Sequence, residues 1–242
     1  TDTLPIPNRK RTADRNHSMA ADKIITVGNG LKKEIEKLAG RNDIEVIGNL
    51  VDLSLFDIRN VKKENNDFIF FSVAFLEGEK GFDTLIKSFA KVYKNKNVKL
   101  VIGGDGSQKE WLKGMAKENG VEPQVLFTGA LSREEVASWM NKCDVFVLPS
   151  RYETFGVVYI EALASGKPVI ATFNGGAEDI INEEVGVLVE IDNVNKLAQA
   201  MEKVKENYNK YNPESLRNYC TEKFSANVII KKIINVYKKV IR

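Results

Sequence analysis

The chain has 242 residues, 43% of them hydrophobic and 29% charged, which is the composition of an ordinary soluble globular protein with one large domain or two small ones. The 36 basic and 33 acidic residues leave a net charge of +3, which is too balanced to indicate a nucleic-acid partner. No apolar run approaches the ~18 residues that a membrane-spanning helix needs. The two cysteines, Cys143 and Cys220, predict a reducing, cytoplasmic compartment and no disulfide framework.

The first stretch, residues 1–23, contains neither the apolar core of a signal peptide nor a helical period. We interpret it as a loop, or as the start of a chain cut from something longer. His17, the only histidine, is interpreted as a surface residue.

From residue 23 onward, short strands alternate with helices. Strands are expected at 23–28, 44–49, 68–75, 98–104, 124–129, 144–150, 168–173 and 186–191. Helices are expected at 29–40, 82–93, 107–119, 132–141, 157–164, 193–207, 213–222 and 225–241. The segment 51–67 is polar and has no pattern, as a linker would. This alternation predicts an α/β, Rossmann-like fold, in which crossover connections place helices on both faces of a parallel sheet.

Ligands of such sheets bind beyond the carboxyl ends of the strands, and one of the loops there carries two carboxylates. Glu161 lies in a helix that is apolar on almost every side, where a lone carboxylate costs free energy unless hydrogen-bond donors surround it. A ribose diol would supply two donors, and Glu153 would face the same crevice. Gly156, at the helix start, lets a diphosphate approach the free N–H groups of Val157 and the next residue. The alternative is an ion pair between Glu161 and an Arg or Lys, with Glu153 as a solvated loop residue.

Three other strand ends carry loops that contain glycine. Lys80 stands at the start of a helix, where its ammonium could reach a phosphate. A Gly-Asp-Gly turn occupies 104–106, and two glycines at 175–176 lead into a short helix at Glu178. A surface lysine or a simple turn explains each loop taken alone, and 104–106 lacks the dinucleotide and P-loop patterns. Four such loops would nevertheless form the rim of one crevice in a doubly wound sheet.

Together these stretches resemble the donor-binding domain of a GT-B glycosyltransferase of the retaining family 4 (glycosyl transferases group 1). The resemblance covers about residues 21–242. Its most specific part is "PSRYETFGVVYIEALASGKPVIATFNGGAEDII", which is similar to the family's Glu-x7-Glu motif, with Glu153 and Glu161 as the two acidic residues. The stretches "EKGFDTLIKSF", "GGDG", "VLFTGAL" and "CDVFVLPS" also follow the family's order and spacing.

The resemblance implies a role for each residue of these stretches. Glu153 and Lys80 would be the catalytic residues, the first binding hydroxyls of the donor sugar and the second contacting the diphosphate. Glu161 would bind the ribose. The other donor-binding residues would be Phe155, Gly156, Val157, Gly104, Asp105, Gly106, Thr128, Leu131, Gly176 and Glu178. No metal and no cofactor are implied, because Lys80 and the helix start would neutralise the leaving diphosphate of the nucleotide-sugar donor.

Two positions depart from the family's pattern. Phe75 stands where the family usually has an Arg, five residues before Lys80. Losing one charge-assisted bond to phosphate typically costs ~1.5–3 kcal/mol, so we expect weaker donor binding unless another basic residue substitutes. Leu50 replaces the glycine of the family's Asn-Gly-Val-Asp linker, and His17 matches no family position.

The resemblance also predicts how the chain is divided. Residues 1–48 would be the tail of an N-terminal acceptor domain, 49–67 a linker, 68–224 the nucleotide-sugar-binding domain, and 225–242 a helix that packs back toward the N-terminal domain. We therefore expect a fragment, or an unusually short homologue, that alone transfers sugar poorly or not at all. Because the helix at 225–242 is basic and amphipathic, peripheral contact with the inner face of an anionic membrane is the alternative to packing.

The predicted function is the transfer, with retention, of a sugar from a UDP- or GDP-linked donor to a glycan, lipid or small acceptor. The alternative is a non-catalytic nucleotide-sugar-binding module or accessory subunit, which Phe75 and the missing front domain both favour. A sugar epimerase of the same architecture is disfavoured by the Glu-x7-Glu stretch. The sequence does not indicate the base, the sugar, the acceptor or the oligomeric state.

Overall fold

The computed structural model describes residues 20–59 and 67–241, so His17 and much of the predicted acceptor-domain tail lie outside the described residues. Most of the described chain forms an α/β domain around a six-stranded sheet whose pairings are all parallel. In spatial order its strands are β5 (Val125–Gly129), β4 (Val98–Gly103), β3 (Phe68–Val73), β6 (Val145–Leu148), β7 (Val169–Thr172) and β8 (Gly186–Val189). The predicted α/β, Rossmann-like fold is confirmed.

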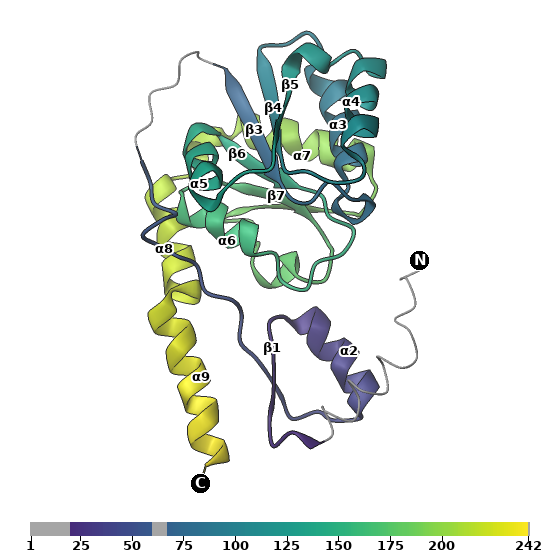
Figure 1. The fold of residues 1–242 in the computed structure, drawn as a ribbon. Helices are drawn as coiled ribbons and strands as arrows, with labels where there is room; N and C mark the ends of the chain where they lie inside the picture. The colour runs from purple at the N-terminus through teal and green to yellow at the C-terminus, as the bar shows by residue number, and fades with distance from the viewer. Residues whose placement is uncertain (1–19, 60–66, 242) are drawn as a thin grey trace.

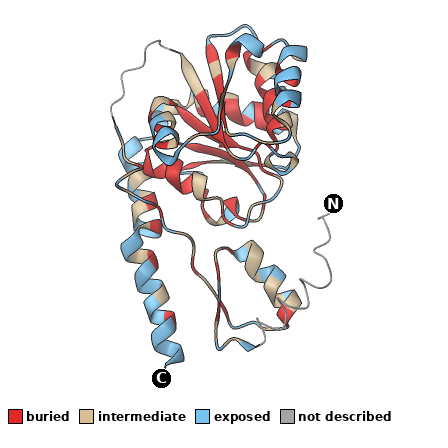
Figure 2. Ribbon diagram, viewed as in Figure 1, coloured by how far each residue is buried: buried red, intermediate tan, exposed pale blue. Residues whose placement is uncertain are grey.

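Helices cover both faces of this sheet (Figure 1). On one face, α3 packs against both α4 and α7, and on the other face α6 packs against both α5 and α8. Their bounds are α3 (Phe82–Tyr93), α4 (Lys109–Glu118), α5 (Arg133–Lys142), α6 (Val157–Ala164), α7 (Val194–Glu206) and α8 (Pro213–Phe224). The central strands are therefore buried on both sides, as Figure 2 shows, which explains their continuous apolar runs.

Several expected strands are shorter in the structure, and short 3₁₀ helices lie between them. The run at 68–75 forms β3 only to Val73, because the chain then turns and Leu76 donates its N–H to the Asp105 carbonyl at 3.0 Å. The 3₁₀ helices are η1 (Gly78–Lys80), η2 (Glu122–Gln124), η3 (Ala177–Asp179) and η4 (Tyr208–Lys210). The loop at Lys80 is thus a single tight turn that leads directly into α3.

The expected linker packs on the sheet domain over its described part. Val51 and Phe56 are buried in the main core, although the surrounding residues are polar. Arg217 of α8 donates hydrogen bonds to the Phe56 carbonyl at 2.8 Å and to the Leu53 carbonyl at 3.0 Å. The polar composition of 51–67 therefore concealed two core residues, while the division of the chain into domains stays a prediction.

A smaller unit precedes the sheet domain. Its two strands, β1 (Ile24–Thr26) and β2 (Ile44–Val46), pair in parallel and are connected by α2 (Asn29–Ala39). The last helix, α9 (Ala226–Val240), extends from the sheet domain (Figure 1), and its buried Ile229 and Val236 pack against Ile47, just after β2.

The start of α2 lies directly against loops of the sheet domain. Asn29 donates to the Asp179 carboxylate from its backbone N–H at 2.6 Å and from its side chain at 2.7 Å. A Cβ on Gly28 would lie 2.8 Å from the Thr154 carbonyl oxygen, so the helix start touches the loop that follows β6. None of the helices in the described part of the chain has the length and apolar character that crossing a bilayer requires.

Candidate active site

The order of strands in the sheet reverses between β3 and β6. Strands β3, β4 and β5 follow one another toward one edge, and β6, β7 and β8 toward the other. The loops after β3 and after β6 therefore meet at the carboxyl end of the sheet, with no crossover helix between them. This arrangement leaves a crevice of the kind in which α/β proteins bind ligands.

A cavity of about 270 Å³ lies at this point. Five of the residues predicted from the sequence line it, and they come from the loop after β3 and from the start of α6 and its preceding loop: Lys80, Glu153, Phe155, Gly156 and Val157. The other lining residues are Asn49, Val73, Ala74, Phe75, Leu148, Thr154 and Val158. Two loops that are distant in the sequence thus enclose one small space.

Lys80 and Glu153 form an ion pair across this cavity. The Lys80 Nζ atom is 2.8 Å from Glu153 Oε1, and Ser150 donates its hydroxyl to the same oxygen at 2.9 Å. The backbone N–H of Glu153 donates to the Asn174 carbonyl at 3.0 Å, which ties this loop to the loop after β7. The site therefore presents an ammonium and a carboxylate together, each partly open to solvent.

Gly156 is required by the backbone at the start of α6. Its φ of 89° lies in the left-handed region, and a Cβ there would overlap the Tyr159 ring. The turn at Gly156 places Val157 and Val158, the first two residues of the helix, on the cavity wall. The unpaired N–H groups of a helix start favour an anion nearby.

Glu161 lies one helical turn after Val157, on the same side of α6, and it is only 3% exposed. Its Oε1 atom is 2.9 Å from an Nη atom of Arg133, whose side chain is 60% exposed. This contact lacks the alignment of a hydrogen bond, and Oε1 has no hydrogen-bond donor among the described residues. Burial raises the pKa of Glu161, and the charge of Arg133 opposes that rise. The ion pair weighed as the alternative is thus present, but the carboxylate stays short of donors.

Arg133 is held in place by its own helix start and by an aromatic ring. Ser132 and Glu135 form a capping box, which fixes the first turn of α5. The Arg133 guanidinium lies over the Phe56 ring, 5.2 Å from its centre. Sequence reasoning anticipated an Arg or Lys partner for Glu161, but nothing in the sequence singled out this one.

The predicted residues that follow β4 and β5 do not line the cavity. Gly104 has a φ of 122°, and a Cβ on it would overlap the Ala74 carbonyl, so this turn packs tightly against the loop after β3. Lys109, by its hydrogen bond, lowers the pKa of Asp105. Thr128 donates its hydroxyl to the Gly129 carbonyl at 3.2 Å. These residues, with Gly106 and Leu131, lie at the same end of the sheet as the cavity but outside its lining.

Gly176 and Glu178 likewise lie outside the lining. The Glu178 carboxylate accepts the N–H of Gly175 at 3.1 and 2.9 Å and so folds back on its own loop. The buried Asn174 side chain joins this loop to the site, because it accepts from the N–H of Gly176 at 3.2 Å and donates to the Tyr159 hydroxyl at 3.0 Å. Asn174 was not anticipated from the sequence, and no short motif marks it.

Phe75 stands on the cavity wall beside Lys80 and is 78% exposed. Lys80 is the one cationic residue in the described lining of the cavity.

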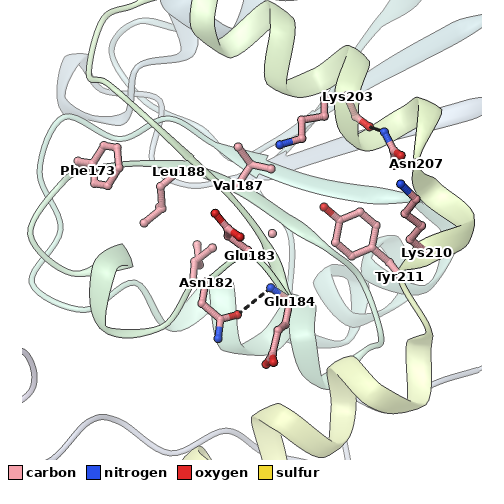
Figure 3. Close-up of a pocket in the computed structure, with 12 residues that line it drawn as sticks. Phe173, Asn182, Glu183, Glu184, Val187, Leu188, Lys203, Asn207, Lys210 and Tyr211 are labelled. Carbon is pink, nitrogen blue, oxygen red and sulfur yellow. Dashed lines mark hydrogen bonds between the residues drawn. The ribbon is translucent and has the colours of Figure 1, made fainter.

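A larger cavity, of about 650 Å³, lies along the outer edge strand β8 (Figure 3). Lys203 of α7 and Tyr211, just after η4, face it, and the loop before β8 contributes Glu183. None of the predicted donor residues lines it, and it runs beside an edge strand, away from the reversal of strand order. The smaller cavity is therefore the candidate active site. Within the described ranges, no three His, Cys, Asp or Glu side chains gather as a metal ion would need.

Comparison with known proteins gives consistent matches over most of the chain. A family model described as glycosyl transferases group 1 matches residues 54–223. An uncharacterised glycosyltransferase of Methanocaldococcus jannaschii is 30% identical over 231 residues, which cover 89% of this chain and 59% of that protein. Glycogen synthase of Mycobacterium tuberculosis is 31% identical over 188 residues, which cover 76% of this chain and 45% of that protein. The chain thus spans about half the length of these curated relatives.

Solved structures share the fold. Sucrose-phosphate synthase of Thermosynechococcus elongatus superposes with a TM-score of 0.88 at 22% identity, covering 100% of this chain and 64% of that one. Anabaena HepE in complex with UDP-glucose gives a TM-score of 0.85 at 22% identity, covering 97% and 68%. At this identity the likeness shows the fold alone. The family model, however, matches more than half of the chain, so the protein belongs to the glycosyl transferases group 1 family, as the motifs around Glu153 and Glu161 predicted.

Proposed function

We propose that this chain is the donor-binding part of a retaining glycosyltransferase that uses a nucleotide-diphosphate-sugar. The observation that carries the proposal is the Lys80–Glu153 pair, which lies at the reversal of strand order beside the start of α6. An ammonium and a helix start together suit a diphosphate, and the neighbouring carboxylate suits the hydroxyls of a sugar. These are the two chemical ends of the bond that such an enzyme breaks.

In the proposed reaction, the bond between the anomeric carbon and the diphosphate breaks while a bond to an acceptor hydroxyl forms on the same face of the sugar. Lys80 and the first N–H groups of α6 stabilise the negative charge that develops on the leaving diphosphate. Glu153 orients the donor sugar through its hydroxyls. Glu161 accepts hydrogen bonds from the ribose diol, which supplies a donor to the buried Oε1 atom that has none among the described residues. No step in this scheme requires a metal ion.

The solved relatives favour a uridine nucleotide. Anabaena HepE was solved with UDP and with UDP-glucose, and TarM of Staphylococcus aureus with UDP. We therefore place UDP-sugars first and GDP-sugars second as donors. The named relatives include a glycogen synthase and an N-acetyl-alpha-D-glucosaminyl L-malate synthase, whose acceptors differ, so the acceptor is left as a glycan, a lipid or a small molecule.

A second candidate is a module that binds a nucleotide-sugar without transferring it. Phe75 favours this candidate, because it leaves Lys80 as the one cation in the described lining of the cavity. The two candidates share the donor site and differ in turnover. A transfer assay with several nucleotide-sugars separates them, since turnover comparable to that of a full-length relative would exclude a module and also our expectation that the isolated chain is poorly active.

Calorimetry with UDP, GDP and ADP tests the donor site itself. We expect wild type to bind at least one of these nucleotides and Glu161→Ala to lose about tenfold in affinity, the loss that follows when a charged acceptor of hydrogen bonds is removed. If no nucleotide binds and Glu161→Ala changes nothing, the donor-site assignment is wrong.

A gain of affinity provides the complementary test. Phe75→Arg adds a second cation beside Lys80, and we expect it to tighten UDP binding about tenfold through one charge-assisted hydrogen bond while UMP binding changes little. Phe75→Gln, which is polar but uncharged, is the matched control and should show no such gain. Equal affinity of Phe75→Arg and Phe75→Gln for UDP would place the diphosphate elsewhere.

A further inference from the structure

Arg151 lies in the loop after β6 that also carries Glu153, and it forms more polar contacts than its position suggests. Its guanidinium donates to both carboxylate oxygens of Asp83 at 3.0 Å. It also contacts both oxygens of Asp192, with Nε at 3.1 Å from one and Nη2 at 2.7 Å from the other. Its remaining donor group reaches the Gly78 carbonyl. One side chain thereby binds three separate segments.

One of these segments and the loop of Arg151 itself carry the pair that defines the candidate site. Gly78 opens η1, the turn that ends at Lys80, and the backbone N–H of Arg151 donates to the carbonyl of the next residue of that turn, Glu79, at 2.7 Å. Arg151 is itself two residues before Glu153. The turn of Lys80 and the loop of Glu153 are therefore joined at their bases by a backbone bond and a side-chain bond.

The carboxylates of Asp192 and Asp83 fix the orientation of the Arg151 side chain. Asp192 follows β8, has a φ of 56° and accepts the Thr84 hydroxyl at 3.2 Å. Asp83 and Thr84 lie in the first turn of α3. The guanidinium is consequently held by residues outside the cavity lining. Burial lowers the pKa of Arg151, but hydrogen bonds to Asp192 and Asp83 outweigh this effect and leave the pKa raised, so the group stays charged.

Arg151 and its two carboxylate partners do not line the cavity. Resting on the proposed function, we propose that Arg151 is a positioning residue for the donor diphosphate, which holds the Lys80 ammonium in register with Glu153 by joining their two loops. A lysine cannot replace it, because the contacts use all three nitrogens of the planar, forked guanidinium. The residue acts through Lys80 and contacts no part of the donor.

The test compares two nucleotides that differ by one phosphate. In the full chain, we measure the Kd of UDP and of UMP by calorimetry for wild type and Arg151→Lys. We expect Arg151→Lys to reduce the preference for UDP over UMP by about tenfold, the effect of displacing one charge-assisted hydrogen bond, while the Kd of UMP changes less than about twofold. An equal loss for both nucleotides would overturn the proposal, because a general structural role would produce it.

A matched control and a double variant make the test specific. Arg217 is also a partly buried arginine that donates to backbone carbonyls, those of Leu53, Phe56 and Ala164, and Arg217→Lys should leave the preference for UDP unchanged. In a Lys80→Ala background, Arg151→Lys should have no further effect on that preference, because both changes remove the same contact. Full additivity of the two changes would overturn the proposal.

Two further arms cover failure of folding and failure of the proposed function. If Arg151→Lys does not fold, Asp192→Asn replaces it, since Asn adopts the left-handed backbone readily, and a smaller loss in the same direction is expected. Crystal structures of the free proteins give a readout without nucleotide. The pair between Lys80 and Glu153, 2.8 Å here, should persist in wild type and separate in Arg151→Lys. An unchanged pair overturns the positioning role, whereas wild type that binds no nucleotide overturns the proposed function.

Discussion

At the scale of single residues, Glu161 is a carboxyl group at a position where burial disfavours its charged form. Burial raises its pKa above the ordinary value of 4.5, and Arg133 opposes this rise. A carboxyl group with a higher pKa in the folded chain binds more protons when folded than when unfolded. Its contribution to stability is therefore full below pH 4.5 and is lost as the pH rises through the folded pKa.

We expect Glu161→Gln to raise the free energy of unfolding by about 1 kcal/mol at pH 7, since it removes a buried charge whose partner is solvent-exposed. The gain should shrink toward zero as the pH falls below about 4.5, where the glutamate is neutral in both states. Urea unfolding across this pH range measures both. Glu110→Gln, at an exposed position on α4, is the control and should change little. Lower stability of Glu161→Gln at pH 7 would show that the Arg133 pair outweighs the cost of burial.

Where a motif named residues, the sequence indicated several that line the cavity, and their roles stay predictions. It missed residues that only the folded chain brings together. Lys80, Glu153 and Gly156 were anticipated because they follow strands in stretches of characteristic spacing. Arg133 and Arg151 were not, because their partners lie on other elements, up to 73 positions away for the Gly78 carbonyl that Arg151 binds. Such pairs depend on how distant elements pack together, which no local sequence pattern indicates.

At the scale of elements, the start of α6 depends on one glycine. The chain leaves β6, passes the Glu153 loop and enters the helix through Gly156, whose left-handed backbone sets the direction of the first turn. Any side chain at this position meets both an unfavourable φ and the Tyr159 ring. The helix start, and with it the cavity wall at Val157, is fixed by this residue.

We expect Gly156→Ala to lower the free energy of unfolding by about 2 kcal/mol or more, because the left-handed backbone alone costs about 1–2 kcal/mol for a residue with a Cβ. Gly114→Ala is the matched control, since Gly114 lies inside α4 with open space where its Cβ would be. That change should raise stability by about 0.5–1 kcal/mol. Urea unfolding of both variants measures the difference, and the same sign of effect at both positions would contradict our account of Gly156.

The helices and strands themselves were predictable, because the spacing of apolar residues agrees with the residues that begin and end each element along most of the chain. The helix expected at 82–93 is α3 with the same two ends, and the helix expected from 132 is α5, whose N-cap is Ser132. The core role of Phe56 was not predictable, since a single aromatic residue in a polar segment has no period. Its burial comes from packing in the main core, and Arg217 of α8 binds its backbone carbonyl.

At the scale of the whole molecule, α9 forms the joint between the sheet domain and the small unit. Ile229 and Val236 are the residues of this helix that are buried, and both pack on Ile47. On the other side of the helix, Ile230, Ile234 and Tyr237 are exposed. Lys239 adds a hydrogen bond to Glu45 of β2 at 3.2 Å. The small unit is therefore attached through a narrow apolar contact with α9 as well as through Asn29.

We expect Val236→Ser to loosen the small unit without unfolding the sheet domain. Hydrogen exchange should show protection lost over 24–46 by about tenfold, because a buried apolar side chain contributes roughly 1.5 kcal/mol or more to such a contact. Protection of β3 and β6 should be unchanged. Ile230→Ser, on the exposed side of the same helix, is the control. Loss of protection throughout the chain would show that the unit and the sheet domain unfold together.

The reversal of strand order has a consequence for how the protein folds. Strands β3 to β5 are neighbours along the chain, and so are strands β6 to β8. Lys80 follows β3 and Glu153 follows β6, so the two residues of the pair are 73 positions apart. Pairing β3 with β6 closes a long loop, and contacts of this kind form late because their entropy cost comes first. The candidate site lies on this seam. A ligand bound there would contact loops from both groups of strands. Besides being a substrate, it would therefore stabilise the pairing that forms last during folding.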